Sequence, residues 1–195
     1  MVADYLALLR DLSALHPPLF VFGSVAEAAL LDGKLAASHG DLDVLISRRE
    51  LEPRLRQLGD LGFADFTVYY EPRPGLPLVY GSTREELTLE LSLLDIDPAG
   101  HPYFVVGTDN GPVSISVPPD LFHWAPTIID GVPVHTLCPL ALVHIRAGAT
   151  ATGAFGPPRP EKDGTRHRRL VDAFLSNVDP AQLEPTITPI SEPQQ

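Results

Sequence analysis

Residues 19–31 constrain the fold more than any other segment, because they predict a strand, a turn and a helix in direct succession. Residues 19–22 are a short apolar run between prolines and a glycine, which is typical of a buried strand. Residues 25–31 are rich in Ala and Leu and favour a helix. The Gly23-Ser24 turn between them would let the backbone approach a ligand, and the N–H groups of the helix would point at an anion. The segment is therefore a candidate phosphate-binding turn, with an ordinary strand-to-helix turn as the alternative.

The next predicted strand, residues 41–46, carries an Asp-x-Asp pair. Because side chains alternate along a strand, Asp41 and Asp43 project from the same face, about 7 Å apart along the backbone. Carboxylates held this close can share one divalent cation or bracket two. A solvated strand edge is the alternative interpretation of the same pattern.

A third carboxylate would complete a two-metal site, and Glu90 is the best placed. In residues 88–93 every odd position is Leu, whereas the even positions are Thr, Glu and Ser. Glu90 is therefore predicted to face away from the packed side of a strand. Asp95 and Asp97 repeat the same spacing, but the Pro-Ala-Gly that follows places them at a strand end or turn.

Apolar periodicity and turn residues predict the remaining elements, and together they indicate an α/β (α+β) fold. We expect a core over residues 1–138, a helical extension over 139–182 and a disordered tail over 183–195. The predicted helices are 4–15, 49–62, 139–149 and 165–175; the further strands are 63–70, 86–96, 113–117 and 132–136; the loops are 71–77 and 149–160.

Composition excludes several classes of protein. With 195 residues, 44% of them hydrophobic, the chain is long enough for a sizeable core. Its net charge of −11 opposes non-specific binding to nucleic acid and suits a cationic partner, a bound divalent metal or simple solubility. The single cysteine, Cys138, is predicted to be a small buried hydrophobic residue, and because no second cysteine exists the chain cannot form an intramolecular disulfide. No apolar run approaches the roughly 20 residues that span a bilayer, and no signal peptide opens the chain, so we expect a cytoplasmic protein.

Three motifs in order resemble one family. They are Phe-Val-Phe-Gly-Ser-Val-Ala at 20–26, Asp-Gly-Lys at 32–34 and His-Gly-Asp-Leu-Asp-Val-Leu-Ile at 39–46. This order is similar to the nucleotidyltransferases of the DNA polymerase β superfold, most of all the aminoglycoside and lincosamide branch. Later segments, Leu-Glu-Leu at 89–91 through Asp-Pro-Ala-Gly at 97–100 and Asp-Gly-Val-Pro-Val at 130–134, extend the resemblance over roughly residues 17–145.

The resemblance implies a mixed sheet flanked by helices, with a C-terminal helical extension. It implies Mg²⁺ held by Asp41, Asp43 and Glu90, which would be both the catalytic and the metal residues. ATP, or another nucleoside triphosphate, would be the co-substrate, with Gly23, Ser24 and Lys34 as its binding residues. The implied reaction transfers a nucleoside monophosphate to a hydroxyl of a small molecule, and a polycationic aminoglycoside is consistent with the acidic charge.

The sequence also departs from the family pattern. Ala37 stands where the family often has a basic residue, Lys34 replaces an Arg, Glu90 replaces an Asp, and Ser92 replaces a His. A degenerate domain that binds a nucleotide or a protein without catalysis is therefore an open alternative, as is a toxin-like enzyme that modifies a protein or tRNA. A partner subunit that completes the acceptor pocket also stays open.

Several other polar residues have two interpretations. For the general base the sequence offers Glu161 and Asp163. His39 would support the strand or adjoin the metals, and Trp124 would pack in the core or stack on a ring. The basic row would be an exposed helix face or a phosphate contact; it comprises Lys162, Arg166, Arg168 and Arg169.

Overall fold

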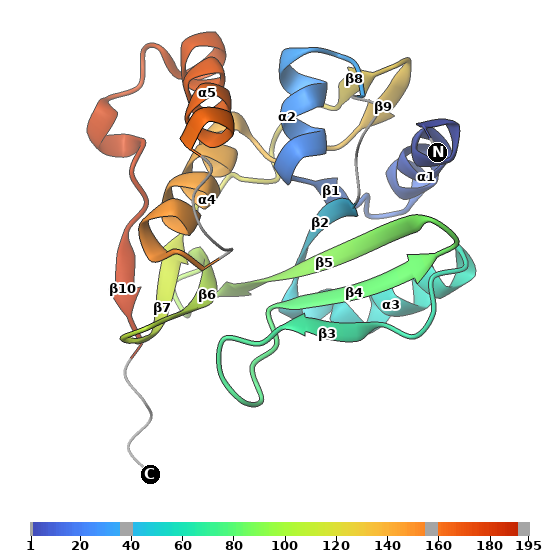
Figure 1. Ribbon diagram of the computed structural model, residues 1–195, viewed down its shortest axis with the longest axis horizontal. Helices are drawn as coiled ribbons and strands as arrows, with labels where there is room; N and C mark the ends of the chain where they lie inside the picture. The colour runs from blue at the N-terminus through green and yellow to red at the C-terminus, as the bar shows by residue number, and fades with distance from the viewer. Residues whose placement is uncertain (1, 36–40, 155–159, 191–195) are drawn as a thin grey trace.

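A mixed sheet of eight strands forms the centre of the molecule (Figure 1). The computed structural model describes residues 2–35, 41–154 and 160–190, without the side chains of residues 2, 3 and 160–163. The strand order is β1-β2-β5-β6-β7-β10, and β4 pairs with β5 and β3 with β4. The strands of this sheet are β1 Phe20–Val21, β2 Asp41–Ser47, β3 Thr67–Tyr70, β4 Val79–Arg84, β5 Leu87–Ile96, β6 Pro102–Thr108, β7 Gly111–Ser116 and β10 Ile187–Pro189.

Strand β5 connects the two halves of the sheet. Its residues 87–94 lie between β2 and β4, and its last two residues pair with β6. The β2–β5 pair is parallel, whereas the other strand pairs among the described residues are antiparallel. Figure 1 shows β5 crossing the molecule from the β3–β4 side to the β6–β7 side. A separate hairpin is formed by β8 Thr127–Ile129 and β9 Val132–Val134.

Helices cover the sheet on both faces. In Figure 1, α3 lies behind β3 and β4, while α2, α4 and α5 stand together on the other side. None of the helices in the described part of the chain is long and apolar enough to cross a membrane. The helices are α1 Val2–Ala14, α2 Gly23–Leu31, α3 Leu51–Asp60 after a 3-10 turn at Arg48–Glu50, α4 Pro139–Thr152, and α5 Pro160–Leu170, which continues as a π-helical turn, Val171–Leu175, and is followed by a 3-10 turn at Pro180–Gln182.

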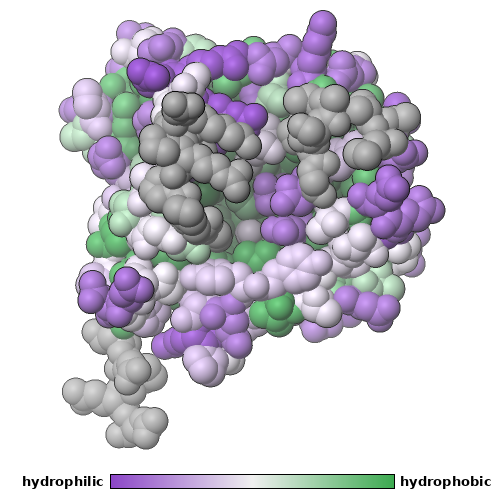
Figure 2. Space-filling view, in the orientation of Figure 1, coloured by the Kyte–Doolittle hydropathy of each residue, from purple (hydrophilic) through white to green (hydrophobic). Residues whose placement is uncertain are grey.

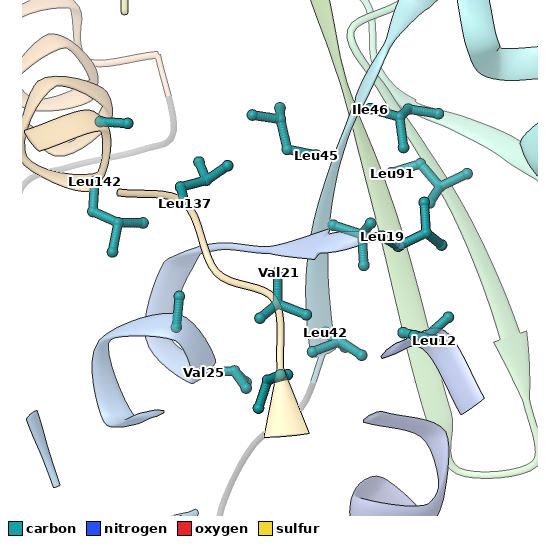
Figure 3. Packing of buried hydrophobic residues seen from close by; sticks show 14 of the residues in the cluster. Leu12, Leu19, Val21, Val25, Leu42, Leu45, Ile46, Leu91, Leu137 and Leu142 are labelled. Carbon is teal, nitrogen blue, oxygen red and sulfur yellow. The ribbon is translucent and has the colours of Figure 1, made fainter. Parts of the chain in front are cut away.

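The core is built from alternate positions of the central strands. Because β2 and β5 pair in register, their apolar positions lie side by side on one face of the sheet. Leu12 and Leu19 belong to the same buried cluster, and Figure 3 shows both near these strands. The opposite face carries Asp41, Asp43 and Glu90 together with the buried Leu45 and Leu94, so the carboxylates lie on the face away from these leucine, valine and isoleucine positions. The buried strand residues on the core face are Leu42, Val44 and Ile46 of β2 and Leu89, Leu91 and Leu93 of β5.

Most predicted elements near the carboxylates are confirmed. The predicted strand 41–46 lies within β2, the predicted strand 86–96 corresponds to β5, and the predicted helix 25–31 lies within α2. The predicted strand 63–70 is confirmed only for its second half, as β3. Strands β4, β6 and β8 were not predicted, because their sequences interrupt the apolar alternation with Gly, Ser, Thr or Pro.

The C-terminal predictions need correction. The predicted disordered tail, 183–195, contains β10, which pairs with β7. All three side chains of β10 are exposed, so backbone hydrogen bonds hold the strand and its sequence shows no apolar pattern. The predicted loop 149–160 is shorter than expected, because α4 continues to Thr152 and α5 begins at Pro160. The division of the chain at residue 138 stays a prediction.

Candidate active site

Three carboxylates from two neighbouring strands converge on the polar face of the sheet. Asp41 and Asp43 belong to β2, and the parallel register places Asp43 directly opposite Glu90 of β5. One oxygen from each of the three carboxylates lies within 4.8 Å of the other two. The convergence follows from the period of two along a strand together with the in-register parallel pairing. The structure thus brings together the three acids that the sequence singled out.

The carboxylates repel one another strongly. Burial, followed by the charges of Asp41, Glu90 and Glu27, raises the pKa of Asp43 to about 7. Burial, followed by the charge of Asp41, also raises the pKa of Glu90. Tyr5 of α1 lies within the same field, because burial and these three carboxylates raise its pKa. A cation placed among the carboxylates would relieve this repulsion.

Gly23 is required where α2 approaches the carboxylates. Its φ of +64° belongs to the left-handed region, and a Cβ at this position would overlap Oδ2 of Asp43. The backbone N–H of Phe22 donates to the carbonyl oxygen of Asp43 at 3.0 Å, which fixes the turn against β2. Only glycine therefore lets helix α2 begin beside the carboxylates.

The N-terminus of α2 has the features of an anion site. Phe22 at the N-cap makes no side-chain capping hydrogen bond, and the first turn contains no acidic residue. The helix N-terminus carries a partial positive charge and N–H groups without partners inside the helix. Gly23 and the half-buried Ser24 stand at this end, beside Asp43. The predicted phosphate-binding turn therefore adjoins the three carboxylates.

A buried ionic cluster connects α2 to the C-terminal helices. Glu27 is only 3% exposed, and its two carboxylate oxygens accept hydrogen bonds from Arg146 of α4 and, at 3.1 Å, from Arg166 of α5. A second, exposed pair joins Asp32 at the end of α2 to Arg169 of α5 at 2.6 Å. Arg166 and Arg169 of the basic row thus bind acidic side chains of α2.

A cavity of about 540 Å³ opens beside the carboxylates. Figure 2 shows the corresponding face hollowed near its centre, where hydrophilic and hydrophobic surfaces meet. The three carboxylates lie at one end, and strands β3, β4, β6 and β7 with helix α4 supply the rest of the wall. The lining residues are Phe22, Asp41, Asp43, Tyr69, Tyr70, Leu78, Val79, Glu90, Ser92, Phe104, Val106, Ile115, Ile145 and Ala154.

Lys34, which the sequence predicts to bind nucleotide, is exposed, and the described lining of the cavity includes neither it nor Gly23 and Ser24. Its role in nucleotide binding stays a prediction. Its turn is fixed to the β8–β9 hairpin instead: the N–H of Leu35 donates to Oδ2 of Asp130 at 2.7 Å. Ala37 and His39 lie outside the described residues, as do the side chains of Glu161, Lys162 and Asp163.

The competing acids have other partners. Asp95 forms a two-pronged ion pair with Arg48, with distances of 2.7 and 2.9 Å. Asp97 accepts hydrogen bonds from the backbone N–H groups of Ala99 and His101, both at 2.8 Å, as the predicted turn requires. The two acids are therefore structural residues of the β5–β6 connection.

Two other predicted residues pack as hydrophobic groups. Trp124 is half-buried and makes an edge-on contact with Phe174, with ring centroids 6.1 Å apart. Cys138 is buried, as expected, and burial raises the pKa of its thiol.

Sequence reasoning missed the two tyrosines of β3 and the buried Glu27. The tyrosines lay in a segment predicted only as a strand, with no polar motif to mark them. Glu27 did carry a signal, because it is the only charged residue in the apolar helix Gly23–Leu31. A single acid in such a helix predicts a buried ionic partner.

The comparisons with known proteins agree on the fold. No protein-family model matches the sequence, and the search of curated proteins gives no match. The solution structure of the antibiotic-resistance factor ANT(2'')-Ia matches with a TM-score of 0.62 and 15% identity over 94% of this chain and 89% of that chain. The crystal structure of ANT(2'')-Ia in complex with adenylyl-2''-tobramycin matches with a TM-score of 0.61 at 15% identity, over 92% of this chain and 95% of that chain.

A third structure extends the likeness to the lincosamide enzymes. The lincomycin-bound lincosamide antibiotic adenylyltransferase LnuA matches with a TM-score of 0.54 and 15% identity, over 89% of this chain and 96% of that chain. The chain therefore has the fold of the antibiotic nucleotidyltransferases. The resemblance noted in the sequence is confirmed at the level of the fold, including the mixed sheet flanked by helices.

Proposed function

We propose that this chain is a magnesium-dependent nucleotidyltransferase that transfers AMP from ATP to a hydroxyl of a small molecule. The observation that carries the proposal is the convergence of Asp41, Asp43 and Glu90 beside the uncapped N-terminus of α2. The fold shared with antibiotic adenylyltransferases supports the same reaction. In its finer form, the acceptor is an aminoglycoside or a lincosamide antibiotic.

The residues present suit Mg²⁺. Mg²⁺ prefers oxygen ligands, and the cluster offers three carboxylates on rigid neighbouring strands. Burial, followed by the charges of neighbouring carboxylates, raises the pKa values of Asp43 and Glu90, and a divalent cation would favour their charged forms. Glu90 reaches the cluster, so the replacement of the family's Asp keeps a carboxylate in place. Asp41, Asp43 and Glu90 would hold the ion.

The reaction exchanges one phosphorus–oxygen bond for another. The acceptor oxygen forms a bond to the α-phosphorus of ATP, the bond from that phosphorus to the pyrophosphate breaks, and the hydroxyl proton passes to a general base. Bound Mg²⁺ would supply neutralisation of the developing negative charge and a lower pKa for the acceptor hydroxyl.

The chain's own groups position the reactants. The N–H groups at the start of α2 would bind the phosphates, and Gly23 keeps their path to the carboxylates free of a side chain. Ser24 stands at the same helix end, and we expect its hydroxyl to contact the phosphates. Glu161 and Asp163 of α5 stay the candidates for the general base.

Titration calorimetry of ATP with Mg²⁺ tests the proposal. The wild type should bind ATP in a metal-dependent manner, and the double variant Asp41→Ala, Asp43→Ala should lose this binding. The double variant Asp11→Ala, Asp60→Ala removes the same charge from exposed positions and should bind like the wild type. Metal-dependent binding that survives in the first variant would contradict the metal assignment.

Pyrophosphate release with labelled ATP and a panel of aminoglycosides and lincosamides tests the transfer itself. Release that depends on an antibiotic supports the finer form. ATP binding without release for any small acceptor supports a degenerate binding domain. Label transferred to a protein or tRNA in a cell extract supports the toxin-like alternative.

A further inference from the structure

The cavity beside the carboxylates is lined mostly by apolar side chains. We infer that, among hydroxyl-bearing acceptors, the cavity selects a largely apolar molecule over a polycation such as an aminoglycoside; this inference rests on the proposed nucleotidyl transfer and narrows its acceptor. Phe104 and Val106 of β6, Ile115 of β7 and Ile145 of α4 line the part of the cavity that would receive the body of the acceptor.

Two glycines fix the aromatic wall of this cavity. Tyr69 lies across Gly81 of β4, where any Cβ would overlap the ring. The hydroxyl of Tyr70 accepts a hydrogen bond from the backbone N–H of Gly107 at 2.9 Å, which ties β3 to β6. The two rings are therefore held in place by the strands opposite them. Such a wall suits stacking against a flat or aliphatic body.

The described lining of the cavity offers few ionic partners to a polycationic acceptor. Within the described lining, the acids are the three carboxylates that the proposed function assigns to Mg²⁺. An aminoglycoside would bring several ammonium groups into the cavity, and each buried charge needs an ionic partner. The described walls supply tyrosine hydroxyls, Ser92 and hydrocarbon instead. Apart from the three carboxylates, the acidic residues that produce the net charge of −11 are therefore not among the described lining residues.

The triphosphate of the nucleotide is expected at Gly23 and Ser24, which do not line the cavity, although the neighbouring Phe22 and Asp43 do. We therefore expect the nucleotide to reach the carboxylate end and the body of the acceptor to occupy the rest. Figure 1 shows β6, β7 and α4 to one side of the carboxylate strands, with the first turn of α2 above them. The volume of about 540 Å³ falls within the range of pockets that enclose drug-sized molecules. The acceptor hydroxyl would then lie at the carboxylate end.

Fluorescence titration with N-phenyl-1-naphthylamine, a neutral apolar probe, tests the inference on the full chain. The wild type should bind the probe, and Ile145→Asp should weaken binding by about tenfold or more by placing a charge in the cavity. Ala151→Asp adds the same charge to an exposed position of α4 outside the lining and should leave binding unchanged. Equal binding by wild type and a folded Ile145→Asp would overturn the inference.

A second pair of variants does not depend on the folding of Ile145→Asp. Tyr69 is 48% exposed and lines the cavity, whereas its neighbour Val68 is 47% exposed and does not. Tyr69→Ala should weaken probe binding by about fivefold to tenfold, and Val68→Ala should not change it. Equal effects of the two variants would overturn the assignment of the aromatic wall.

Competition identifies the class of ligand. A neutral alcohol such as 2-naphthaleneethanol should displace the probe, whereas tobramycin should not. Displacement by a non-hydrolysable ATP analogue with Mg²⁺ would show that the cavity holds the nucleoside, and would overturn the inference.

Pyrophosphate release separates this inference from the proposed function. Release with the neutral alcohol but not with tobramycin supports both. Release with tobramycin alone overturns the inference and leaves the proposed function standing. Probe binding without release for any acceptor overturns the proposed function and still supports an apolar ligand.

Discussion

Gly23 is required both for the backbone conformation at the start of α2 and for the position of the Asp43 carboxylate. It has a left-handed φ, and it faces Asp43 so closely that a single methyl group would displace the carboxylate. Gly153, at the end of α4, has nearly the same φ of +65°, but among the described residues no heavy atom lies within 4 Å of the position that its Cβ would take. The two glycines therefore share the backbone strain and differ in the carboxylate contact.

We expect Gly23→Ala and Gly153→Ala to separate these two effects. Both should lose about 1–2 kcal/mol of unfolding free energy because alanine disfavours positive φ. Only Gly23→Ala should also weaken Mg²⁺ binding, by about 10- to 100-fold, because it moves a proposed ligand. Urea unfolding and metal titration measure the two quantities. Equal metal affinities would contradict the role given to Gly23.

The pKa of Asp43 predicts that metal binding depends on pH. Because this pKa is raised to about 7, a proton competes with the cation below that value. The Mg²⁺ affinity should fall by about tenfold per pH unit below 7, if one proton is displaced, and level off above it. Titration calorimetry between pH 6 and 8 checks this, and a flat profile would contradict it.

The same raised pKa has the opposite effect on the metal-free protein. The folded state holds this proton more tightly than the unfolded state does, so the contribution of Asp43 to stability is complete below about pH 4 and is lost as the pH rises through 7. Metal-free Asp43→Asn should therefore lose less stability than the wild type between pH 5 and 8. Urea unfolding at the two pH values measures the difference.

At the scale of elements, helices α2, α4 and α5 are joined by a buried ionic cluster around Glu27 and by one exposed ion pair between Asp32 and Arg169. Glu27→Ala would leave Arg146 and Arg166 without their shared partner in a mostly buried position. We expect a loss of about 3–5 kcal/mol in unfolding free energy. Asp32→Ala removes the exposed ion pair with Arg169 of α5 and should cost much less, because solvent screens exposed pairs. Urea unfolding distinguishes the two variants, and equal losses of unfolding free energy would contradict the stabilising role of the buried cluster around Glu27.

The elements also show how far the sequence could predict the structure. Strands β2 and β5 were predictable because apolar and polar positions alternate along them, and helix α2 because its segment is rich in Ala and Leu. The three carboxylates were predictable because the alternation along the strands fixes the face on which they project. Strand β10 was not, because its pairing with β7 depends on backbone groups that every residue has.

The cavity could not be predicted, because its walls come from segments that are distant in the sequence. Tyr69 and Tyr70 acquire their role only when Gly81 and Gly107 lie opposite them. Similarly, Glu27 had no visible partner, since Arg146 and Arg166 follow more than a hundred residues later. Single-sequence patterns report on local period, whereas these contacts depend on tertiary arrangement.

At the scale of the whole molecule, the net charge of −11 gives two separable responses to salt. Self-repulsion should make the melting temperature rise with NaCl, because salt screens surface charges. MgCl₂ at equal ionic strength should raise it further, because a cation that binds only the folded state stabilises it. Asp43→Asn should abolish the additional rise and keep the NaCl response. Differential scanning calorimetry checks both, and an unchanged Mg²⁺ increment in the variant would contradict the site.

The parallel pairing of β2 with β5 also determines when the carboxylate cluster can exist during folding. Helix α3 and strands β3 and β4 lie between the two strands in the chain, so Asp43 meets Glu90 only after this long segment has closed. Long-range parallel pairing is slow because the loop must close before its contacts form. A chain still emerging from the ribosome would carry both aspartates before it carried their partner strand. The three-carboxylate site would then be able to bind a metal only after strands β2 and β5 have paired.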